Sequence, residues 1–546
     1  MFLFAKECCF IMLLRVGITV LTWQGSFMSL HLSKKSILKK TAQVGALTLL
    51  SRLLGIVREF LLTRFLGVGA VSDAFIAAFK LPNFFRHVFA EGALSASFVP
   101  VFIKTVKEGN RKEANGLMTI SFLFFEGLVL ALYLFVLLKT NWVLMILAPG
   151  FSAEQAAYAI PFLRILFSFL FFISSSALLG GALHSINHFF TPAFGTPLWN
   201  LIYVGTLILC VTFKLPVTFL CAGIIFGAFV QFCLHLIMFF RFNFSFGRID
   251  AGVRALFGAI LAKFLPCLLG VSIVELNLFI GTSIASFLPE GSTTLLYLAS
   301  RFMNIPLGMF AAAFSNVMLT HFSRLVLYAP RRLNFYMLEV AKFVTWIIVP
   351  IMLFLMIVAF PLFGFLLASK AMPGQVNQGG IILIFYSSGL IFSCFNKIVL
   401  SMFYALKDTK ATTIAAAACA LVNIAGDVTS LWLGGSYGIA FANTLASACM
   451  TGLCILFLYK RHGIVFYGGA YAQFLWRFML QLFFVCLTVA SLGLILYQFL
   501  SYSGHVFLFQ GKWFLCVATM GLGLVMGLMF LTKQRFGLNI YFLERH

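Results

Sequence analysis

The chain has 546 residues, of which 62% are hydrophobic and only 10% are charged, and its formal net charge is +23. A soluble globular protein carries about 25% charged residues, so this composition excludes a soluble fold and predicts an all-α polytopic membrane protein. The basic residues alternate with hydrophobic spans instead of forming one exposed patch, so we expect no nucleic-acid partner.

The first 33 residues are predicted to be an N-terminal extension followed by a basic segment. Residues 1–27 resemble a signal or a short extra span, but Arg15 interrupts the apolar run. A start codon assigned too early, with Met28 opening the polypeptide, explains the same residues. Both interpretations stay open, and neither changes the rest of the fold.

Spans of about 20 apolar residues, the length that crosses a bilayer, recur along the remaining chain. Fourteen are predicted, at roughly 41–66, 72–103, 114–138, 154–184, 190–212, 216–240, 255–288, 293–322, 336–368, 379–405, 411–433, 437–459, 473–499 and 506–532. Alternate connections are rich in Lys and Arg, as at 104–112, 241–254 and 324–332. By the positive-inside rule these connections, and both termini, are expected to be cytoplasmic.

A faint internal repeat divides the spans into two lobes. ALSASFVPVF (93–102) aligns with AFSNVMLTHF (313–322), and a nearby offset aligns 181–200 with 404–423. Repeats of this kind are common in secondary transporters, whose substrate sites lie between the halves. We therefore predict a first lobe at 34–245 with six spans, a second lobe at 246–462 with six more, and a C-terminal part at 463–546 with two spans and a short tail.

The first two spans carry charges, although both are long enough to cross the membrane. Charged side chains near the bilayer centre cost at least about 2.5–3.5 kcal/mol and usually face a bundle interior or a water-filled cavity. Together with Arg301 in the eighth span, these spans hold six basic residues against three acids: Arg52, Arg58, Arg64, Lys80, Arg86 and Arg301 against Glu59, Asp73 and Glu91. Internal pairing, for example of Arg58 with Asp73, explains some of them. The surplus predicts an anion-binding cavity, and because arginine forks match phosphate bidentately, a diphosphate suits it.

The run SRLLGIVREFLLTRFLGVGAVSDAFIAAFKLPNFFRHVFAEGALSASFVPVF (51–102) closely resembles the signature of the MurJ/MviN family. These proteins are lipid II flippases of the multidrug/oligosaccharidyl-lipid/polysaccharide exporter superfamily. RFMNIPLGMFAAAFS (301–315) and FYALKDTK (403–410) extend the resemblance over about residues 35–460. It implies two six-helix lobes in a V around a central cavity, with two C-terminal helices forming a lipid-facing groove.

The resemblance also implies a role for particular residues and partners. Arg52, Arg58, Asp73, Arg86 and Arg301 match positions that the family needs for transport, the arginines engaging the lipid-linked diphosphate. The implied substrate is lipid II, an undecaprenyl-diphosphate-linked disaccharide peptide used in cell-wall synthesis, and other peptidoglycan synthesis proteins are possible partners. The implied location is the bacterial inner membrane. The chain departs from the family's acids at Ser300 and Asn304, and from its frequent prolines at Thr320 and Ala411.

A second polar group lies in the eleventh and twelfth spans. Asn423 and Asp427 are four residues apart, hence on one helix face, and Thr444 sits on the next span. Oxygen ligands of this kind suit a hard monovalent cation, and similar positions hold Na⁺ in sodium-coupled relatives. The seventh-span acid expected by that resemblance is Gly281 here, with Glu275 as a possible stand-in. A polar helix–helix contact that satisfies Asp427 is the alternative.

The sequence favours a transporter without covalent chemistry. No nucleotide-binding GxxxxGK[ST] loop is present, so we expect membrane potential or an ion gradient, of Na⁺ or H⁺, to drive the cycle. The twelve cysteines show no CxxC spacing and are expected to be buried hydrophobes, with neither a metal nor another cofactor bound. A flippase for another polyprenyl-diphosphate oligosaccharide and a multidrug exporter of the same superfamily remain the alternatives. An enzyme acting on polyprenyl phosphates would need an acidic metal cluster, and the sequence contains none.

Overall fold

The computed structural model describes residues 34–108, 110–367, 374–502 and 511–544. Within these ranges, side chains are described except at 34–39, 41, 89–92, 269–271, 273, 274, 277, 278, 499–502, 511 and 512. The predicted N-terminal extension and the side chain of Glu91 therefore lie outside the described residues. All regular secondary structure in the described residues is helical, and no strand occurs among them.

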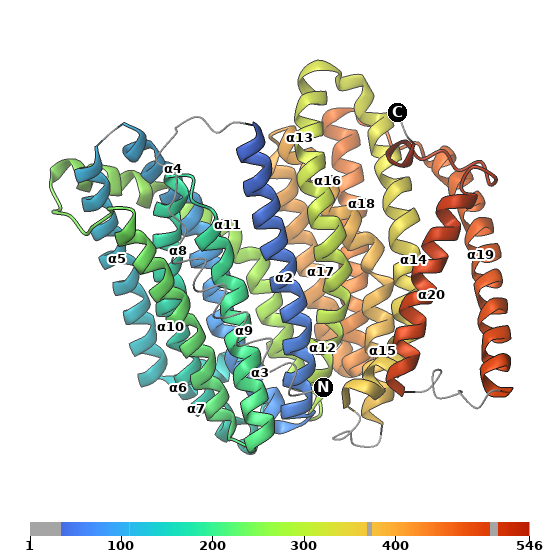
Figure 1. Cartoon of the computed structure of the whole chain (residues 1–546), viewed down its shortest axis with the longest axis horizontal. Helices are drawn as coiled ribbons and strands as arrows, with labels where there is room; N and C mark the ends of the chain where they lie inside the picture. The colour runs from blue at the N-terminus through green and yellow to red at the C-terminus, as the bar shows by residue number, and fades with distance from the viewer. Residues whose placement is uncertain (1–33, 109, 368–373, 503–510, 545–546) are drawn as a thin grey trace.

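The first lobe contains six long helical segments, which we call rods, and several of them are broken into shorter helices (Figure 1). Its elements are α2 (Lys34–Leu66), α3 (Ala70–Phe85), η1 (Arg86–Ala93), α4 (Leu94–Lys107), α5 (Arg111–Leu138), α6 (Thr140–Leu147), α7 (Ala153–Phe167), α8 (Phe169–Ser185), α9 (Phe190–Phe213) and α10 (Val217–Arg241). The rods are α2, α3–η1–α4, α5, α7–α8, α9 and α10, and α6 is a short helix between two of them.

The second lobe and the C-terminal part contain the remaining eight rods. Their elements are α11 (Ala251–Ala285), α12 (Ser292–Pro306), η2 (Leu307–Ala311), α13 (Ala312–Tyr328), η3 (Pro330–Arg332), α14 (Leu333–Leu367), α15 (Gln375–Ser388), α16 (Leu390–Ala405), α17 (Thr409–Leu433), α18 (Gly435–His462), α19 (Gly468–Tyr502), α20 (Gly511–Thr532) and η5 (Tyr541–Leu543). In Figure 1, α19 and α20 stand at the edge of the molecule farthest from the first lobe.

The all-α polytopic fold predicted from the sequence is confirmed. Twelve of the fourteen described rods are long and apolar enough to cross a membrane, and the two that fall outside this group are α2 and α3–η1–α4. A helix satisfies its backbone hydrogen bonds internally, so it can cross the hydrocarbon region. The charged side chains of α2 and α3–η1–α4 need polar surroundings, and their positions decide where a site can form.

Polar caps begin several helices at one end of the bundle. The side chains of Asn110, Asp250 and Asp408 accept hydrogen bonds from the backbone N–H groups three residues later, at 3.2, 2.9 and 3.0 Å. Such caps satisfy donors that have no partner within the helix. Because this end also carries the Lys- and Arg-rich connections, we call it the basic end, and the other the opposite end.

A π-helical turn interrupts the second rod of each lobe. In the first lobe η1 follows Pro82 of α3, and in the second lobe η2 directly follows Pro306 of α12. Proline removes a backbone donor and disturbs the regular helix around it, and π turns are frequent at functional sites. Each break lies within one helical turn before a segment that the internal repeat aligns. This supports the internal duplication that relates the two lobes.

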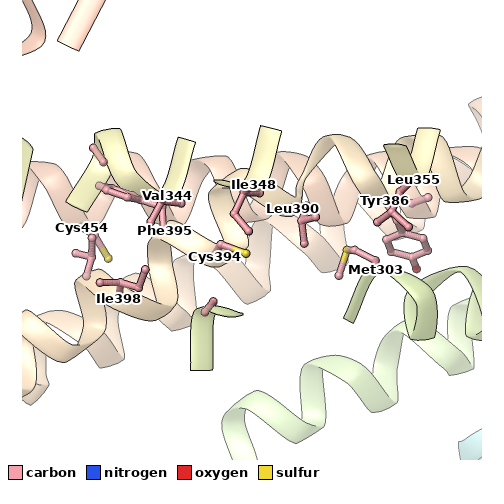
Figure 2. Packing of buried hydrophobic residues seen from close by; sticks show 14 of the residues in the cluster. Met303, Val344, Ile348, Leu355, Tyr386, Leu390, Cys394, Phe395, Ile398 and Cys454 are labelled. Atoms are coloured by element: carbon pink, nitrogen blue, oxygen red, sulfur yellow. The ribbon is translucent and has the colours of Figure 1, made fainter. Parts of the chain in front are cut away.

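Buried hydrophobic side chains form separate cores in the two lobes. Figure 2 shows part of the second-lobe core, where Val344 and Ile348 of α14 pack against Cys394 and Ile398 of α16. A further cluster joins α14 to α19 and α20. Most of the side chains in each core come from one lobe, so each lobe is packed mainly around its own core.

The seventh rod, α11, packs partly with the lobe that precedes it. Val253, Phe257, Ile260 and Phe264 are buried in a first-lobe cluster that also contains residues of α4, η1 and α5. The boundary predicted at 245/246 puts the start of α11 in the second lobe, but its packing puts it in the first. Farther along, α11 approaches α17 of the second lobe, so this helix ties the two lobes together.

The two lobes also meet at the opposite end. The Gly150 N–H donates to Ser286 Oγ at 3.0 Å, and Ser152 Oγ donates to Glu290 at 3.3 Å. The Gln375 side chain reaches the carbonyl oxygen of Val68 at 3.4 Å. These contacts hold the connections of both lobes against each other at this end of the bundle.

Candidate substrate site between the lobes

Arg58 of α2 is held inside the first lobe by aromatic and polar neighbours on α9. Its Nη1 donates to Asn200 Oδ1 at 2.9 Å, and its guanidinium carbon lies 5.4 Å from the Trp199 ring and 5.3 Å from the Tyr203 ring. Its Nη2 pairs with Glu59 Oε1 at 2.6 Å. Only 14% of the Arg58 side chain is exposed, so these contacts fix the position of its charge.

Glu59 connects this arginine to the second lobe. The Tyr297 hydroxyl of α12 lies 3.1 Å from each carboxylate oxygen of Glu59, and Arg301 Nε lies 3.8 Å from Oε1. The Arg301 guanidinium also stands over the Tyr297 ring at 4.8 Å. One carboxylate thus holds guanidinium groups from both lobes. Some internal pairing was expected, with Arg58 and Asp73 as the example, and the partner of Arg58 in the structure is Glu59.

Arg52 approaches the same helix of the second lobe nearer the basic end. A Cβ atom added to Gly308 would lie 3.4 Å from Arg52 Nη1, so the guanidinium rests against the backbone of η2. Arg52 is exposed and forms no hydrogen bond or ion pair with the described residues. The Arg301 side chain is 47% exposed. Both guanidinium groups are therefore accessible to a ligand.

The charge balance of this group is positive. Arg52, Arg58 and Arg301 supply three guanidinium groups, and Glu59 supplies one carboxylate, which leaves two net positive charges. We call these four residues together with Tyr297 the arginine cluster. Tyr297, Asn200 and Trp199 were missed by sequence reasoning, although Tyr297 precedes Arg301 by four residues and so shares its helix face.

Two other predicted cations lie elsewhere along the same rod. Arg86 of η1 donates from Nε to Asn83 Oδ1 at 3.2 Å, and its Nη2 lies 3.0 Å from His87 Nε2. Lys80 of α3 donates to the Thr282 hydroxyl of α11. These contacts join Arg86 to neighbours in its own helix turn and make Lys80 a link from α3 to α11, where Lys80 also feels the charge of Arg301.

Asp73 lies at the opposite end, in a contact between the lobes. Its carboxylate accepts hydrogen bonds from the N–H of Gly291 at 2.6 Å, the N–H of Thr294 at 2.8 Å and the Thr294 hydroxyl at 2.5 Å. Gln155 Nε2 adds a fourth at 3.3 Å. Asp73 is 1% exposed. The carboxylate caps the start of α12, where a helix favours negative charge, so the structure places Asp73 in a closing contact and apart from the arginines.

The predicted ion group is only partly brought together. Asn423 Nδ2 donates to Asp427 Oδ2 at 3.2 Å, both residues are buried, and Oδ1 of each has no hydrogen-bond partner among the described residues. Thr444 instead donates to the carbonyl oxygen of Phe385 at 2.8 Å. A Cβ atom on Gly281 would lie 3.3 Å from Asp427 Oδ2, so α11 does pass this carboxylate at the predicted position. Glu275 lies about 9 Å back from Gly281 toward the start of that helix.

Asn423 and Asp427 present buried acceptor oxygens, and the charge of Lys80 of α3 acts on the Asp427 carboxylate. Two buried oxygens without partners are costly unless something binds them, and amide and carboxylate oxygens are ligands for hard cations. No group of three or more His, Cys, Asp or Glu side chains suited to a metal ion occurs within the described ranges. Any site here would therefore use the oxygens of these two residues and the neighbouring backbone.

Two helical lobes that share charged groups across their interface define the class of two-lobed membrane transporters. Comparisons with known proteins agree with this class. A family model described as "Lipid II flippase MurJ" matches residues 62–515. The chain belongs to the MurJ family. It is 30% identical over 438 residues to the "Probable lipid II flippase MurJ" of Vibrio cholerae serotype O1, which covers 76% of this chain and 81% of that protein.

Solved structures show the same fold. One described as "Lipid II flippase MurJ, inward closed conformation" has a TM-score of 0.74 and 23% identity, covering 90% of this chain and 99% of that chain. An inward-facing multidrug resistance transporter of the MATE family and MOP superfamily has a TM-score of 0.63 and 15% identity, covering 76% and 94%. Because the fold is shared with drug exporters, the site has to distinguish the functions.

Proposed function

We propose that this protein is a lipid II flippase, which moves the head group of a polyprenyl-diphosphate-linked disaccharide peptide across the membrane by alternating access. The observation that carries the proposal is the arginine cluster, in which cations from separate lobes meet with two net positive charges to spare. Two exposed guanidinium groups can each take a bidentate hydrogen-bonded phosphate. The family and its relatives' names support the same substrate.

The geometry suggests how binding would be coupled to movement. Glu59 holds Arg58 and Arg301 in place before the substrate arrives, which lowers the cost of assembling the cations. A diphosphate between Arg52 and Arg301 would bridge the lobes, because these residues belong to α2 and α12 respectively. Its charge would favour an approach of the lobes near the basic end, while the Asp73 contact at the opposite end would have to open for release.

The multidrug exporter is the weaker candidate. A net positive site repels the cationic compounds that many drug exporters carry, and only one carboxylate belongs to the arginine cluster. A flippase for another diphosphate-linked oligosaccharide uses the same phosphate chemistry. We propose lipid II because the family model and the relatives carry that name. We also propose that the protein lies in the inner membrane with its basic end and both termini in the cytoplasm, on the positive-inside rule.

Complementation tests the proposal. In a strain depleted of its own lipid II flippase, the wild-type chain should restore growth, and Arg52→Ala and Arg301→Ala should fail or grow poorly. Each charged hydrogen bond lost costs about 1.5–3 kcal/mol, or about ten- to a hundred-fold in affinity. Arg164→Ala is the matched control, since Arg164 bonds Thr140 at 2.9 Å on the far rods of the first lobe. Full rescue by both cluster variants, with membrane levels equal to the control, would remove the assignment.

We further propose that the unpartnered oxygens of Asn423 and Asp427 bind the coupling cation, Na⁺ or H⁺. The thermal stability of the purified protein in NaCl should exceed that in choline chloride at equal ionic strength if the ion is Na⁺. Asp427→Asn should abolish the difference. If transport depends on pH but not on Na⁺, and Asp427→Asn removes that dependence, H⁺ is the ion. Transport that is unchanged in the variant under both gradients would rule out coupling at this pair.

A further inference from the structure

An open pocket of about 480 Å³ lies along α13, on the basic-end side of the arginine cluster. It is lined by Asn316, Val317, Thr320, His321 and Arg324. Four of these five side chains are polar, and neither Asn316, Thr320 nor Arg324 forms a hydrogen bond or ion pair with the described residues. The Nε2 atom of His321 is buried and also has no hydrogen-bond partner in the described part of the chain. The pocket therefore presents donors that nothing in the described protein satisfies.

The π turn of η2 places this pocket on the same helix face as Arg301. An α-helix turns about 100° per residue, so an uninterrupted helix would put Arg324, 23 residues on, about 140° away from Arg301. A π turn accommodates one extra residue and so sets the face back by about 100°. Thr320 then falls in line with Arg301, and Asn316 and Arg324 lie about 40° to either side.

The residues between these two points mark the face as continuous. Asn304, Met309 and Ala313 are all exposed, and they follow one another along the same stripe from Arg301 to Asn316. Gly308 beside them is the residue against which Arg52 of the first lobe rests. One face of α12–η2–α13 therefore runs from the arginine cluster to the pocket. At Gly308, where Arg52 rests, this face is directed toward the first lobe.

The separation of the two sites suits different parts of one head group. At 1.5 Å per residue, the pocket residues lie about 22–34 Å from Arg301 along the helix axis. An extended peptide of about five residues spans up to about 17 Å, and in lipid II it is joined to the diphosphate through a sugar. The long side chains of Arg301 and Arg324 shorten the gap further.

The chemistry of the pocket selects the peptide rather than the sugar or the diphosphate. Arg324 offers a single guanidinium, which pairs with one carboxylate, whereas the diphosphate has three guanidinium groups in the arginine cluster. Asn316 and Thr320 can donate to and accept from peptide groups. Tyr336 lies against the His321 ring, with ring centres 4.5 Å apart, and so fixes this wall of the pocket.

We propose that the α13 pocket binds a carboxylate of the peptide portion of the head group, through Arg324 with Asn316 and Thr320, while the diphosphate occupies the arginine cluster. This rests on the proposed function and adds a second recognition point to it. The two points would distinguish a lipid-linked disaccharide peptide from a lipid-linked sugar that carries no peptide.

Binding to the purified full-length protein tests the proposal with two ligands. One is lipid II, and the other is the same polyprenyl-diphosphate disaccharide without its peptide. Arg324→Gln should weaken binding of lipid II by about ten-fold and leave the peptide-free ligand unchanged. Arg301→Ala should weaken both. Arg331→Gln is the matched control, because Arg331 is an exposed arginine of η3 close to the pocket along the chain but outside its lining.

The outcomes separate this inference from the proposed function. Unchanged binding of the peptide-free ligand shows that the Arg324→Gln protein is folded. Equal affinity of that variant and the wild type for lipid II, or an equal loss for both ligands, would overturn the peptide site. If Arg301→Ala affects neither ligand, the proposed function fails instead. Asn316→Leu offers a second variant at an exposed position, and it should also weaken only the ligand that carries the peptide.

Discussion

Replacing Glu59 by glutamine should reveal how the arginine cluster is held ready for an anion. The substitution keeps the size of the side chain and removes its charge. The Arg58–Glu59 pair, at 2.6 Å with side chains 14% and 9% exposed, is buried, and removing one partner of a buried pair costs about 3–5 kcal/mol. Arg301 is 47% exposed and 3.8 Å away, so its share is at most about 1 kcal/mol. Because glutamine still accepts from Tyr297, we expect a net loss of about 3 kcal/mol.

The same substitution should strengthen the response to an anionic ligand. Without Glu59, the net charge of the cluster rises from two to three positive charges, so a diphosphate replaces a missing counter-charge. In a thermal-shift assay in detergent, Glu59→Gln should melt below the wild type. Added polyprenyl diphosphate should raise its melting temperature by more than it raises that of the wild type, because ligand binding to the native state alone stabilises it.

Glu126→Gln is the matched control for this experiment. Glu126 of α5 is also a carboxylate within the bundle, and Ser174 donates to its Oε1 at 2.6 Å, but Oε2 has no partner among the described residues. Removing that charge should not destabilise the protein by a comparable amount, and it should not alter the response to ligand. A Glu59→Gln protein with the melting temperature of the wild type, or with the same ligand-induced shift, would refute the role given to Glu59.

Two further predictions concern the ends of the bundle. Asp408 caps α17. The hydrogen bond from the Ala411 N–H, with Arg461 nearby, holds the pKa of the Asp408 carboxyl below its usual value. The stabilising effect of this carboxylate is therefore present above the unfolded pKa of about 3.9 and is lost as pH falls through the folded pKa. Asp408→Ala should lower stability by about 0.5–2 kcal/mol at pH 7, and melting curves of the variant and the wild type should converge in acid; a gap that is independent of pH would contradict this. At the opposite end, a Cβ atom added to Gly150 would lie 2.6 Å from the backbone of Phe287. Gly150→Ala should therefore push the lobes apart there and increase thiol labelling of a cysteine introduced at position 290. Unchanged labelling would argue against closure by this contact.

The sequence predicted the architecture well because each rod is encoded locally. A run of about 20 apolar residues can be recognised without knowing its neighbours, and the predicted bounds of the ninth and eleventh spans fall within three residues of the ends of α14 and α17. The arginines that face the other lobe were predicted for a similar reason, since a charge within an apolar span must turn toward polar surroundings.

The partners of these charges were beyond the reach of the sequence. Internal pairing in the first two spans was expected to explain some charges, with Arg58 and Asp73 as the example, yet Asp73 sits at the start of its helix, where it caps α12 from the other lobe. Glu59 is adjacent to Arg58 in sequence, and a helix directs neighbouring residues about 100° apart, so only the tertiary arrangement shows that their side chains meet. The role of the π turn in aligning Arg324 with Arg301 was also invisible, because sequence spacing assumes a regular helix.

The packing of α11 bears on how the two halves of the chain are assembled. Its first part is buried among the helices that precede it, although the connection at 242–250 separates it from them in sequence. Two polypeptides produced by a break in that connection would still interlock, since the downstream fragment inserts a helix into the upstream one. A gene split at this point should therefore yield two fragments that assemble into a functional protein. If the split came after α11, no helix of the second fragment would insert into the first, and the fragments would meet only through contacts at helix ends.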